Sequence, residues 1–165
     1  MTRLGSPRFA TLAVALALVL LASACGSATE ERALPDVELE RLGAQGTLTV
    51  NDPVGPTVYN LWATWCAPCR AELPAFDAVA ARTTDVEIIG VNVGDTGPDA
   101  GELVAELELR FPQVLDPTAR IQRGLRIPGL PATIFVDSEG DVLSVHNGEL
   151  TEEELDELID ENFRS

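Results

Sequence analysis

The chain has 165 residues and a formal net charge of -16, with 27 acidic residues against 11 arginines and no lysine. Binding to nucleic acid needs a basic surface, so this composition argues against a nucleic-acid partner. Three cysteines are too few for a disulfide scaffold, and the length allows one ordinary hydrophobic core.

Residues 1–24 have the pattern of an export signal. Arg3 and Arg8 precede an apolar run over residues 9–21, which ends in small residues. A transmembrane helix usually needs about 20 apolar residues, and this run is shorter. We therefore predict a cleaved signal peptide and not a membrane span.

Cys25 follows directly, in a segment that resembles a bacterial lipobox, where the cysteine is diacylated and becomes the mature N-terminus. The match is imperfect, because Ala22 stands where leucine is usual. Ordinary signal peptidase would cut at the same place, so the two routes remain open. We predict lipidation at Cys25 and a tether over residues 25–35, whose small and charged residues show no period. Without acylation the protein would be secreted.

The next part of the chain predicts strands around one helix. Apolar residues alternate over residues 37–42, and residues 47–50 are β-prone, which predicts a two-stranded ribbon. Residues 57–62 form a short apolar run typical of a buried central strand. Apolar positions then recur at helical spacing over residues 69–80, where Pro74 predicts a kink.

Further strand and helix signals follow. An apolar run predicts a strand over residues 86–93. Asp99, with Glu102 three residues later, is the predicted cap of the next helix. A short helix is expected over residues 117–123.

The C-terminal part predicts a hairpin and a last helix. The hairpin has strands at residues 132–137 and 142–145. Thr151 and Glu154 form a capping box before the helix. The whole order predicts a mixed sheet covered by helices on both faces.

Cys66 and Cys69 stand where the predicted central strand meets the helix. Side chains three residues apart at a helix start share one face, so these two can form a disulfide after small adjustment. The unpaired N–H groups and positive dipole end of the helix stabilise a thiolate. Such sites lower a cysteine pKa from about 8.5 to roughly 3.5–7.5. We therefore predict that Cys66 attacks and Cys69 resolves the mixed disulfide, with Arg70 adding positive charge nearby.

Other uses of the pair remain open from the residues alone. A structural disulfide over so short a loop would restrain little chain entropy. A zinc site would need further ligands, and His146, the single histidine, is expected at the surface. Paired thiols also bind Cu(I), although no methionine-rich segment accompanies them. We predict neither a bound metal nor another cofactor.

Residues 62–74 read Trp-Ala-Thr-Trp-Cys-Ala-Pro-Cys-Arg-Ala-Glu-Leu-Pro. This segment resembles the active site of the thioredoxin superfamily, and looks most like the membrane-attached TlpA/ResA branch of thiol-disulfide oxidoreductases. The resemblance runs over residues 34–162. It implies an α/β, thioredoxin-like domain over residues 36–165, with a mixed central sheet, helices on both faces and an N-terminal β-ribbon.

A second segment, residues 127–133, also resembles a signature of this family. Pro131 matches the cis-proline that packs against the active-site disulfide. The resemblance implies that Leu130 offers its backbone to an extended substrate. We expect Trp65 to form an apolar wall beside Cys66.

Two departures from ordinary thioredoxin stand beside the motif. Asn60 occupies the place of a buried acid on the central strand. Glu72 lies three residues beyond Cys69 on the same helical face, and the resemblance implies that it tunes the thiols and shuttles a proton. The plainer alternatives are a hydrogen-bonded strand asparagine and a solvated glutamate.

The expected function is an extracytoplasmic thiol-disulfide oxidoreductase that reduces protein disulfides through Cys66 and Cys69. Apocytochrome c is a candidate substrate by family likeness alone. We expect a monomer, attached to the outer face of the cytoplasmic membrane through Cys25 and supplied by a membrane electron donor. The alternatives are a disulfide-forming oxidase and a lipid-anchored Cu(I) metallochaperone. A peroxidase fits least, because no cysteine preceded by threonine stands in the usual loop.

Overall fold

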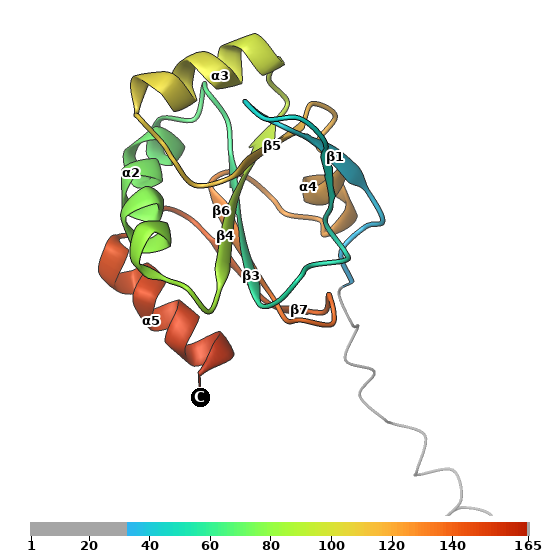
Figure 1. Ribbon diagram of the computed structural model, residues 1–165, viewed down its shortest axis with the longest axis vertical. Helices are drawn as coiled ribbons and strands as arrows, with labels where there is room; N and C mark the ends of the chain where they lie inside the picture. Colours follow the sequence, from blue (N-terminus) through green and yellow to red (C-terminus); the bar gives the residue numbers. More distant parts are fainter. Residues whose placement is uncertain (1–32, 165) are drawn as a thin grey trace, which may run out of the picture. The chain divides into compact units, whose positions relative to one another are not determined.

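The computed structural model describes residues 33–164. The predicted signal peptide, Cys25 and most of the tether lie outside this range. Within it, seven strands form one sheet in the order β2-β1-β5-β4-β3-β6-β7 (Figure 1). The strands are β1 (Glu38–Arg41), β2 (Thr47–Thr49), β3 (Thr57–Trp62), β4 (Glu87–Val93), β5 (Gln113–Asp116), β6 (Ala132–Val136) and β7 (Val142–Asn147).

The sheet is mixed, as predicted. β3, β4 and β5 run parallel to one another, and β6 pairs antiparallel with β3 and with β7. β1 pairs antiparallel with both β2 and β5, so the predicted N-terminal ribbon extends the sheet at one edge.

Helices cover both faces of this sheet. They are α2 (Ala67–Arg82), α3 (Gly97–Glu106), α4 (Arg120–Gly124) and α5 (Glu152–Phe163). α2 and α5 lie side by side on one face and share a core cluster with α3, whereas α4 packs into the cluster on the other face (Figure 1). No helix within residues 33–164 is long and apolar enough to cross a membrane.

The central strand β3 separates the two core clusters. All six of its residues are buried, because neighbouring strands lie on both sides and helices on both faces. Val58 and Trp62 belong to the cluster under α2, and Tyr59 and Leu61 to the cluster on the opposite face. Burying an aliphatic or aromatic side chain of this size contributes about 1.5–3 kcal/mol. The predicted central strand is therefore confirmed.

A close contact ties β3 to its neighbours near the end of the strand. The Trp62 indole Nε1 donates to Gln113 Oε1 at 2.9 Å. Gln113 lies over Gly90 of β4, so closely that a Cβ atom at position 90 would overlap with Gln113 Oε1. Gly90 thus makes room for the amide that holds the Trp62 ring.

Three local predictions were wrong or incomplete. β5 was not predicted, because it has only four residues and polar ends, Gln113 and Asp116. Thr96, not Asp99, is the N-cap of α3, since its hydroxyl accepts a hydrogen bond from the Asp99 N–H. α4 begins at Arg120, later than expected, with its preceding residue Ala119 in a left-handed conformation.

The C-terminal predictions are confirmed. β6 and β7 form the predicted hairpin, and β7 continues two residues further than expected, to Asn147. Thr151 and Glu154 make both hydrogen bonds of the capping box at the start of α5. α2 is one helix through Pro74, whose predicted kink stays a prediction.

Candidate active site

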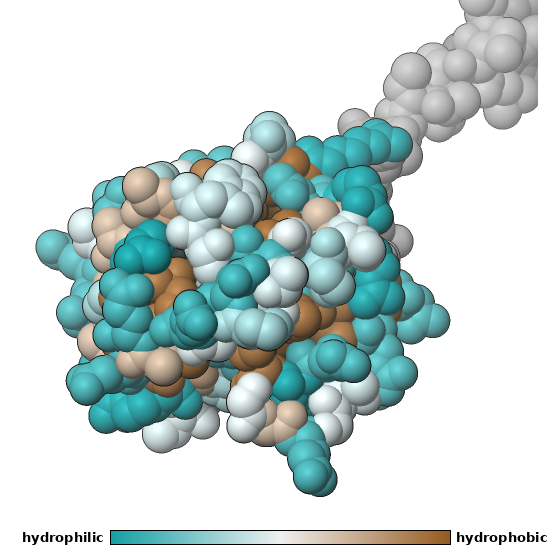
Figure 2. Space-filling model, turned by 90° about the horizontal axis from the view of Figure 1, so that it is seen from above, coloured by the Kyte–Doolittle hydropathy of each residue, from teal (hydrophilic) through white to brown (hydrophobic). Residues whose placement is uncertain are grey.

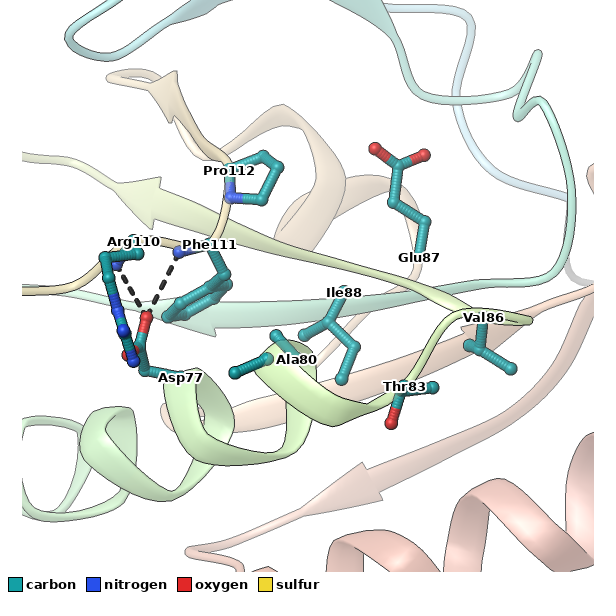
Figure 3. A pocket seen from close by; sticks show the side chains of 10 residues that line it. Asp77, Ala80, Thr83, Val86, Glu87, Ile88, Arg110, Phe111 and Pro112 are labelled. Carbon is teal, nitrogen blue, oxygen red and sulfur yellow. Dashed lines mark hydrogen bonds and ion pairs between the residues drawn. The ribbon is translucent and has the colours of Figure 1, made fainter.

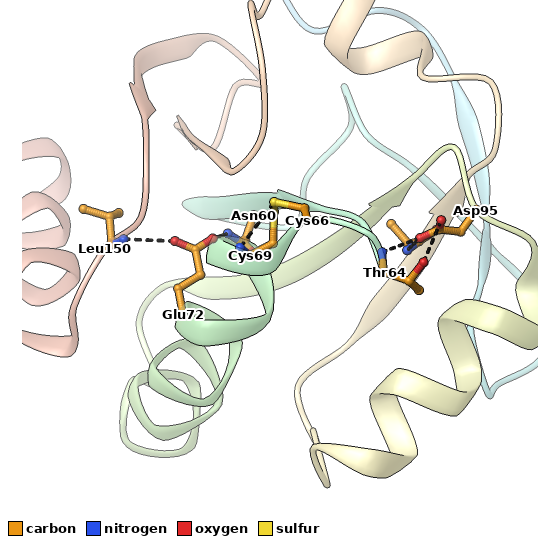
Figure 4. The surroundings of a disulfide bond; sticks show 8 residues. Asn60, Thr64, Cys66, Cys69, Glu72, Asp95 and Leu150 are labelled. Carbon is orange, nitrogen blue, oxygen red and sulfur yellow. Dashed lines mark hydrogen bonds between the residues drawn. A yellow bond between two sulfur atoms is a disulfide. The ribbon is translucent and has the colours of Figure 1, made fainter.

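The Cys66–Cys69 disulfide lies at the N-terminus of α2, directly after β3 (Figure 4). Cys66 is the N-cap residue, and its Sγ accepts a hydrogen bond from the Cys69 N–H at 3.3 Å. Pro68 sits in the first turn, where a missing N–H costs little. Cys66 is 5% exposed and Cys69 is fully buried. Cys66 is thus the more exposed residue of the pair, and its role as the attacking thiol stays a prediction.

Glu72 is buried one turn further along α2, with 1% of its surface exposed. Asn60 Nδ2 donates to one carboxylate oxygen at 2.7 Å, and the Leu150 N–H donates to the other at 2.9 Å (Figure 4). Burial raises the pKa of Glu72 to about 7, and the two hydrogen bonds only partly oppose this. Glu72 is therefore not a solvated glutamate, and it can take up or release a proton near neutral pH.

Asn60 connects the sheet to this carboxylate. It lies within β3, between Gly90 of β4 and Thr133 of β6. Its amide nitrogen binds Glu72, whereas its amide oxygen is buried without a hydrogen-bond partner within the described chain. Asn60 is thus a strand residue and also a direct partner of Glu72.

The Leu130–Pro131 peptide bond is cis, which confirms that part of the prediction. Pro131 is buried directly before β6, and Leu130 is partly buried against both core clusters. The Pro131 carbonyl accepts a hydrogen bond from the Gly148 N–H at 3.0 Å, which leaves the segment anchored to the end of β7. Substrate binding by Leu130 and Pro131 stays a prediction.

Trp65 is the exposed aromatic residue of the motif. Its side chain is 70% exposed, directly before Cys66, whereas Trp62 is fully buried. An exposed tryptophan next to a reactive sulfur offers a rigid apolar contact to a partner chain. The end of the molecule where β3 leads into α2 shows hydrophobic patches among hydrophilic residues (Figure 2).

Asp95 holds the loop that carries Trp65, and the sequence analysis missed it. Its two carboxylate oxygens accept hydrogen bonds from the Thr64 N–H at 2.7 Å and the Thr64 hydroxyl at 2.9 Å. Asn92 Nδ2 binds the same carboxylate at 2.8 Å. The carboxyl ends of parallel β3 and β4 lie at one edge of the sheet, so a polar residue just after β4 could have been linked to the motif just after β3.

A separate cavity of about 280 Å³ lies between the C-terminal half of α2 and the start of β4 (Figure 3). Asp77 at its wall accepts hydrogen bonds from the backbone N–H groups of Arg110 and Phe111, at 2.6 and 3.2 Å. Burial opposes ionisation, but these bonds and the Arg110 guanidinium hold the pKa of Asp77 below its usual range. The cavity lining contains no cysteine or histidine, so it is not part of the redox site.

Within residues 33–164, no group of three or more His, Cys, Asp or Glu side chains is arranged to hold a metal ion. His146 is partly buried on β7 and lines a small pocket with Leu150 and residues of α5. That position, at a surface pocket, agrees with the surface location expected for the single histidine.

The sequence is similar to a known protein family and to proteins named for thiol-disulfide exchange. The AhpC/TSA family profile matches residues 31–145. The chain is 35% identical over 129 residues to the thiol:disulfide interchange protein HelX of Rhodobacter capsulatus, covering 76% of this chain and 72% of HelX. It is 30% identical over 135 residues to the thiol-disulfide oxidoreductase ResA of Oceanobacillus iheyensis, covering 78% and 70%.

Solved structures agree with this result. MTB DsbF, determined in mixed oxidised and reduced forms, superposes with a TM-score of 0.66 at 28% identity, covering 74% of this chain and 93% of DsbF. A secreted thiol-disulfide isomerase from Corynebacterium glutamicum gives a TM-score of 0.65 at 26% identity, covering 79% and 83%. Both similarities extend over nearly all of the described fold.

Proposed function

The chain belongs to the AhpC/TSA family of the thioredoxin superfamily and is a thiol-disulfide oxidoreductase, and we propose that it reduces disulfides of partner proteins outside the cytoplasm. Cys66 and Cys69 are the reacting pair, since they form the disulfide at the helix N-terminus. The chemical surroundings of the two cysteines support reduction of the partner's disulfide and not its formation.

The supporting observation is the burial of Glu72 beside the pair. A pair becomes a strong oxidant when its reduced form is stabilised as a thiolate. A carboxylate in an apolar site does the opposite, because a second negative charge nearby raises the pKa of a thiol. Within the described residues, Glu72 receives hydrogen bonds from neutral groups only, Asn60 and the Leu150 backbone. We infer that the thiolate form of the reduced pair is only weakly stabilised. The pair should therefore donate its electrons to a partner disulfide.

The reaction then has two exchange steps. The Cys66 thiolate attacks the partner's disulfide, a Cys66–partner bond forms, and one partner sulfur leaves as a thiolate. Cys69 loses its proton to the Glu72 carboxylate and attacks Cys66 Sγ. The second partner sulfur leaves, the Cys66–Cys69 bond closes, and Glu72 holds one proton. Two electrons have passed to the partner.

The location and partners follow from the N-terminal pattern and from family likeness. We propose export by residues 1–24 and attachment by lipid at Cys25 to the outer face of the cytoplasmic membrane. One structural relative, the thiol-disulfide isomerase of Corynebacterium glutamicum, is a secreted protein, which supports an extracytoplasmic site. Reduction there requires a membrane electron donor. The intact mass of membrane-extracted protein tests the anchor, because a mature chain without acyl groups would exclude it.

The reduction potential of the Cys66–Cys69 couple tests the direction. Equilibration with glutathione should give a value near about -250 mV or lower. A value near about -120 mV, typical of strong oxidants, would instead identify a disulfide-forming oxidase. Titration of the reduced protein with Cu(I) separately tests the metallochaperone alternative.

The natural substrate can be trapped on the protein. In a Cys69→Ser variant, Cys66 still attacks but nothing resolves the mixed disulfide, so adducts should accumulate in the cell envelope. Apocytochrome c is the proposed substrate, and mass spectrometry of the adducts tests it. The Cys66→Ser variant is the control and should trap nothing by this route.

A further inference from the structure

The turn of residues 148–150, which joins β7 to α5, is hydrogen-bonded to the site at both of its ends. At one end, the Leu150 N–H donates to Glu72 Oε2 at 2.9 Å (Figure 4). At the other end, the Gly148 N–H donates to the Pro131 carbonyl at 3.0 Å. Three consecutive residues thus connect the buried carboxyl group of α2 with the segment before β6.

The backbone of the 148–150 turn has little freedom to adapt. Gly148 has a φ of +118°, a conformation that glycine adopts far more readily than other residues. Asn147, directly before it, is paired with Ala132 in the β6–β7 hairpin. Leu150 is buried in the core cluster that α2 and α5 share. A change at one end of the turn should therefore reach the other end and not be absorbed between them.

The Leu130–Pro131 segment lies on the side of the core that holds the disulfide. Leu130 packs against the core cluster that includes Cys66 and Cys69. Its backbone is the predicted contact for an extended partner chain. The Pro131 carbonyl, which accepts the Gly148 N–H, belongs to the same short segment. The turn thus supports the backbone on which a partner is expected to bind.

The charge of Glu72 sets the strength of its hydrogen bond to the turn. A hydrogen bond to a carboxylate is roughly twice as strong as one to a neutral group. Protonation of Glu72 therefore weakens its bonds to both Asn60 and Leu150. Asn60 lies in β3, which is paired with a strand on each side, whereas Glu149 in the middle of the turn is exposed. The turn is thus the part that can respond to the lost charge.

Few charged groups face Glu72 among the described residues. Burial raises its pKa, and the negative charge of Glu149 adds to this. From α2 it faces the Cys66–Cys69 disulfide, which does not titrate, and from β3 the neutral Asn60. The titratable side chains behind the turn line a surface pocket of β7 and α5: His146, Glu154, Glu157 and Glu161. A pH effect on the turn can therefore be assigned to Glu72 by changing these neighbours.

We propose that the 148–150 turn couples the proton on Glu72 to the binding of a partner chain at the Leu130–Pro131 segment. While Glu72 is an anion, it holds the turn, and the turn holds the Pro131 carbonyl in place. When Glu72 takes the Cys69 proton as the disulfide closes, the turn loosens and the reduced partner is released. This inference rests on the proposed function of Glu72 as proton acceptor and adds no covalent step.

Hydrogen exchange in the oxidised protein measures the coupling without redox turnover. The protection of the Gly148 and Leu150 N–H groups, each corrected for its intrinsic exchange rate, should fall about fivefold or more between pH 8.5 and 5.5. The midpoint of this change should equal that of the Glu72 carboxyl carbon, followed by NMR. Glu72→Gln should show the low protection at both pH values, because its side chain is always neutral.

Three variants separate the response to Glu72 from other titrations. Glu149→Gln should lower the midpoint of Glu72, and the change in protection should move with it. His146→Gln and Asp77→Asn should leave the midpoint and the change in protection as they are. Equal protection at both pH values in the unmodified protein would overturn the proposal. So would a change that His146→Gln abolishes, or one whose midpoint differs from that of Glu72 in any variant.

A covalent adduct tests the effect on the partner chain. A five-residue peptide with one central cysteine is joined to Cys66 of the Cys69→Ser variant. At least one peptide N–H should be protected at pH 8.5 and should lose about fivefold or more of that protection by pH 5.5. Adding Glu72→Gln should give low protection at both pH values. A peptide that is unprotected at pH 8.5, or equally protected at both, would overturn the link to partner binding. Insulin reduction by Glu72→Gln tests the proposed function separately, because the coupling needs no proton from Cys69.

Discussion

Two buried carboxylates on α2 ionise in opposite ways. Glu72 and Asp77 both belong to the buried side of the helix, five residues apart. Burial opposes the charge of each, yet the pKa of Glu72 is raised to about 7 and that of Asp77 is lowered. Asp77 has the Arg110 guanidinium at 2.8 Å besides two backbone donors, whereas Glu72 has only neutral donors. The backbone N–H of Arg110, together with its guanidinium and the Phe111 N–H, outweighs burial at Asp77, whereas burial prevails at Glu72.

Among variants of these two carboxylates, the largest effect is expected for Glu72→Gln, on the rate of disulfide reduction. Glu72→Gln removes the proton acceptor, so the rate of disulfide reduction should fall about 10²-fold or more. The pH dependence near 7 should also disappear from that rate. Stopped-flow reduction of a peptide disulfide over pH 5–9 measures both.

Asp77→Asn is the matched control, because it neutralises a buried acid of the same helix away from the cysteines. Its rate and pH profile should equal those of the unmodified protein. An equal loss in both variants would mean that the helix, and not the proton, is disturbed.

The two acids should also give opposite dependences of stability on pH. The folded-state pKa of Glu72 lies above its value of 4.5 in the unfolded chain, so its stabilising contribution is complete below pH 4.5 and is lost as pH rises through about 7. The loss amounts to roughly 3 kcal/mol of unfolding free energy. The lowered pKa of Asp77 contributes stability above its ordinary value, which is lost as pH falls through the folded-state pKa.

Urea unfolding of the oxidised protein between pH 3 and 8 measures these contributions. Glu72→Gln should remove the decline in unfolding free energy between pH 4.5 and 7 and keep the loss of stability at lower pH. Asp77→Asn should reduce only the loss of stability at low pH. A decline that persists in Glu72→Gln would contradict the assignment.

A smaller effect is expected when Asp77 loses its cation. Arg110→Met keeps the backbone donors but removes the guanidinium, so the pKa of Asp77 should rise toward its ordinary value. The Arg110 side chain is 76% exposed, so the loss of stability should be small and should shrink in high salt. Carboxyl NMR titration and urea unfolding at two salt concentrations provide the measurement. An unchanged titration of Asp77 would assign its ionisation to the backbone alone.

The smallest effect is expected at Asp95, whose carboxylate accepts hydrogen bonds from Thr64 in the loop that carries Trp65. Asp95→Ala removes the hydrogen bonds to Thr64, each worth about 0.5–1.5 kcal/mol. Because the loop orders a contact surface and not the cysteines, KM for a protein disulfide should rise by roughly 2–10-fold, with little change in kcat. Thr64→Ala, which keeps the backbone hydrogen bond, should have a weaker effect. A fall in kcat alone would mean that Asp95 acts on the thiols.

The sequence alone predicted the local features and missed the long-range contacts. β3, the β6–β7 hairpin and the capping box carry strong local signals, and the cis bond before Pro131 followed from family likeness. Asn60 and Glu72 were identified one by one. Their hydrogen bond, and the one from Leu150, join residues 12 and 78 positions apart, which no periodicity reports.

The contact between Gly90 and Gln113 has a consequence for how this fold can vary. Gln113 fills the space where a residue-90 side chain would begin, and it holds Trp62, four residues before Cys66. A side chain at position 90 therefore requires either that the Gln113 amide moves away or that a smaller residue replaces Gln113, and in both cases the Trp62 indole loses its acceptor. Alanine at position 90 together with a small residue at 113 should be tolerated far better than alanine at 90 alone. In a family alignment the two columns should covary.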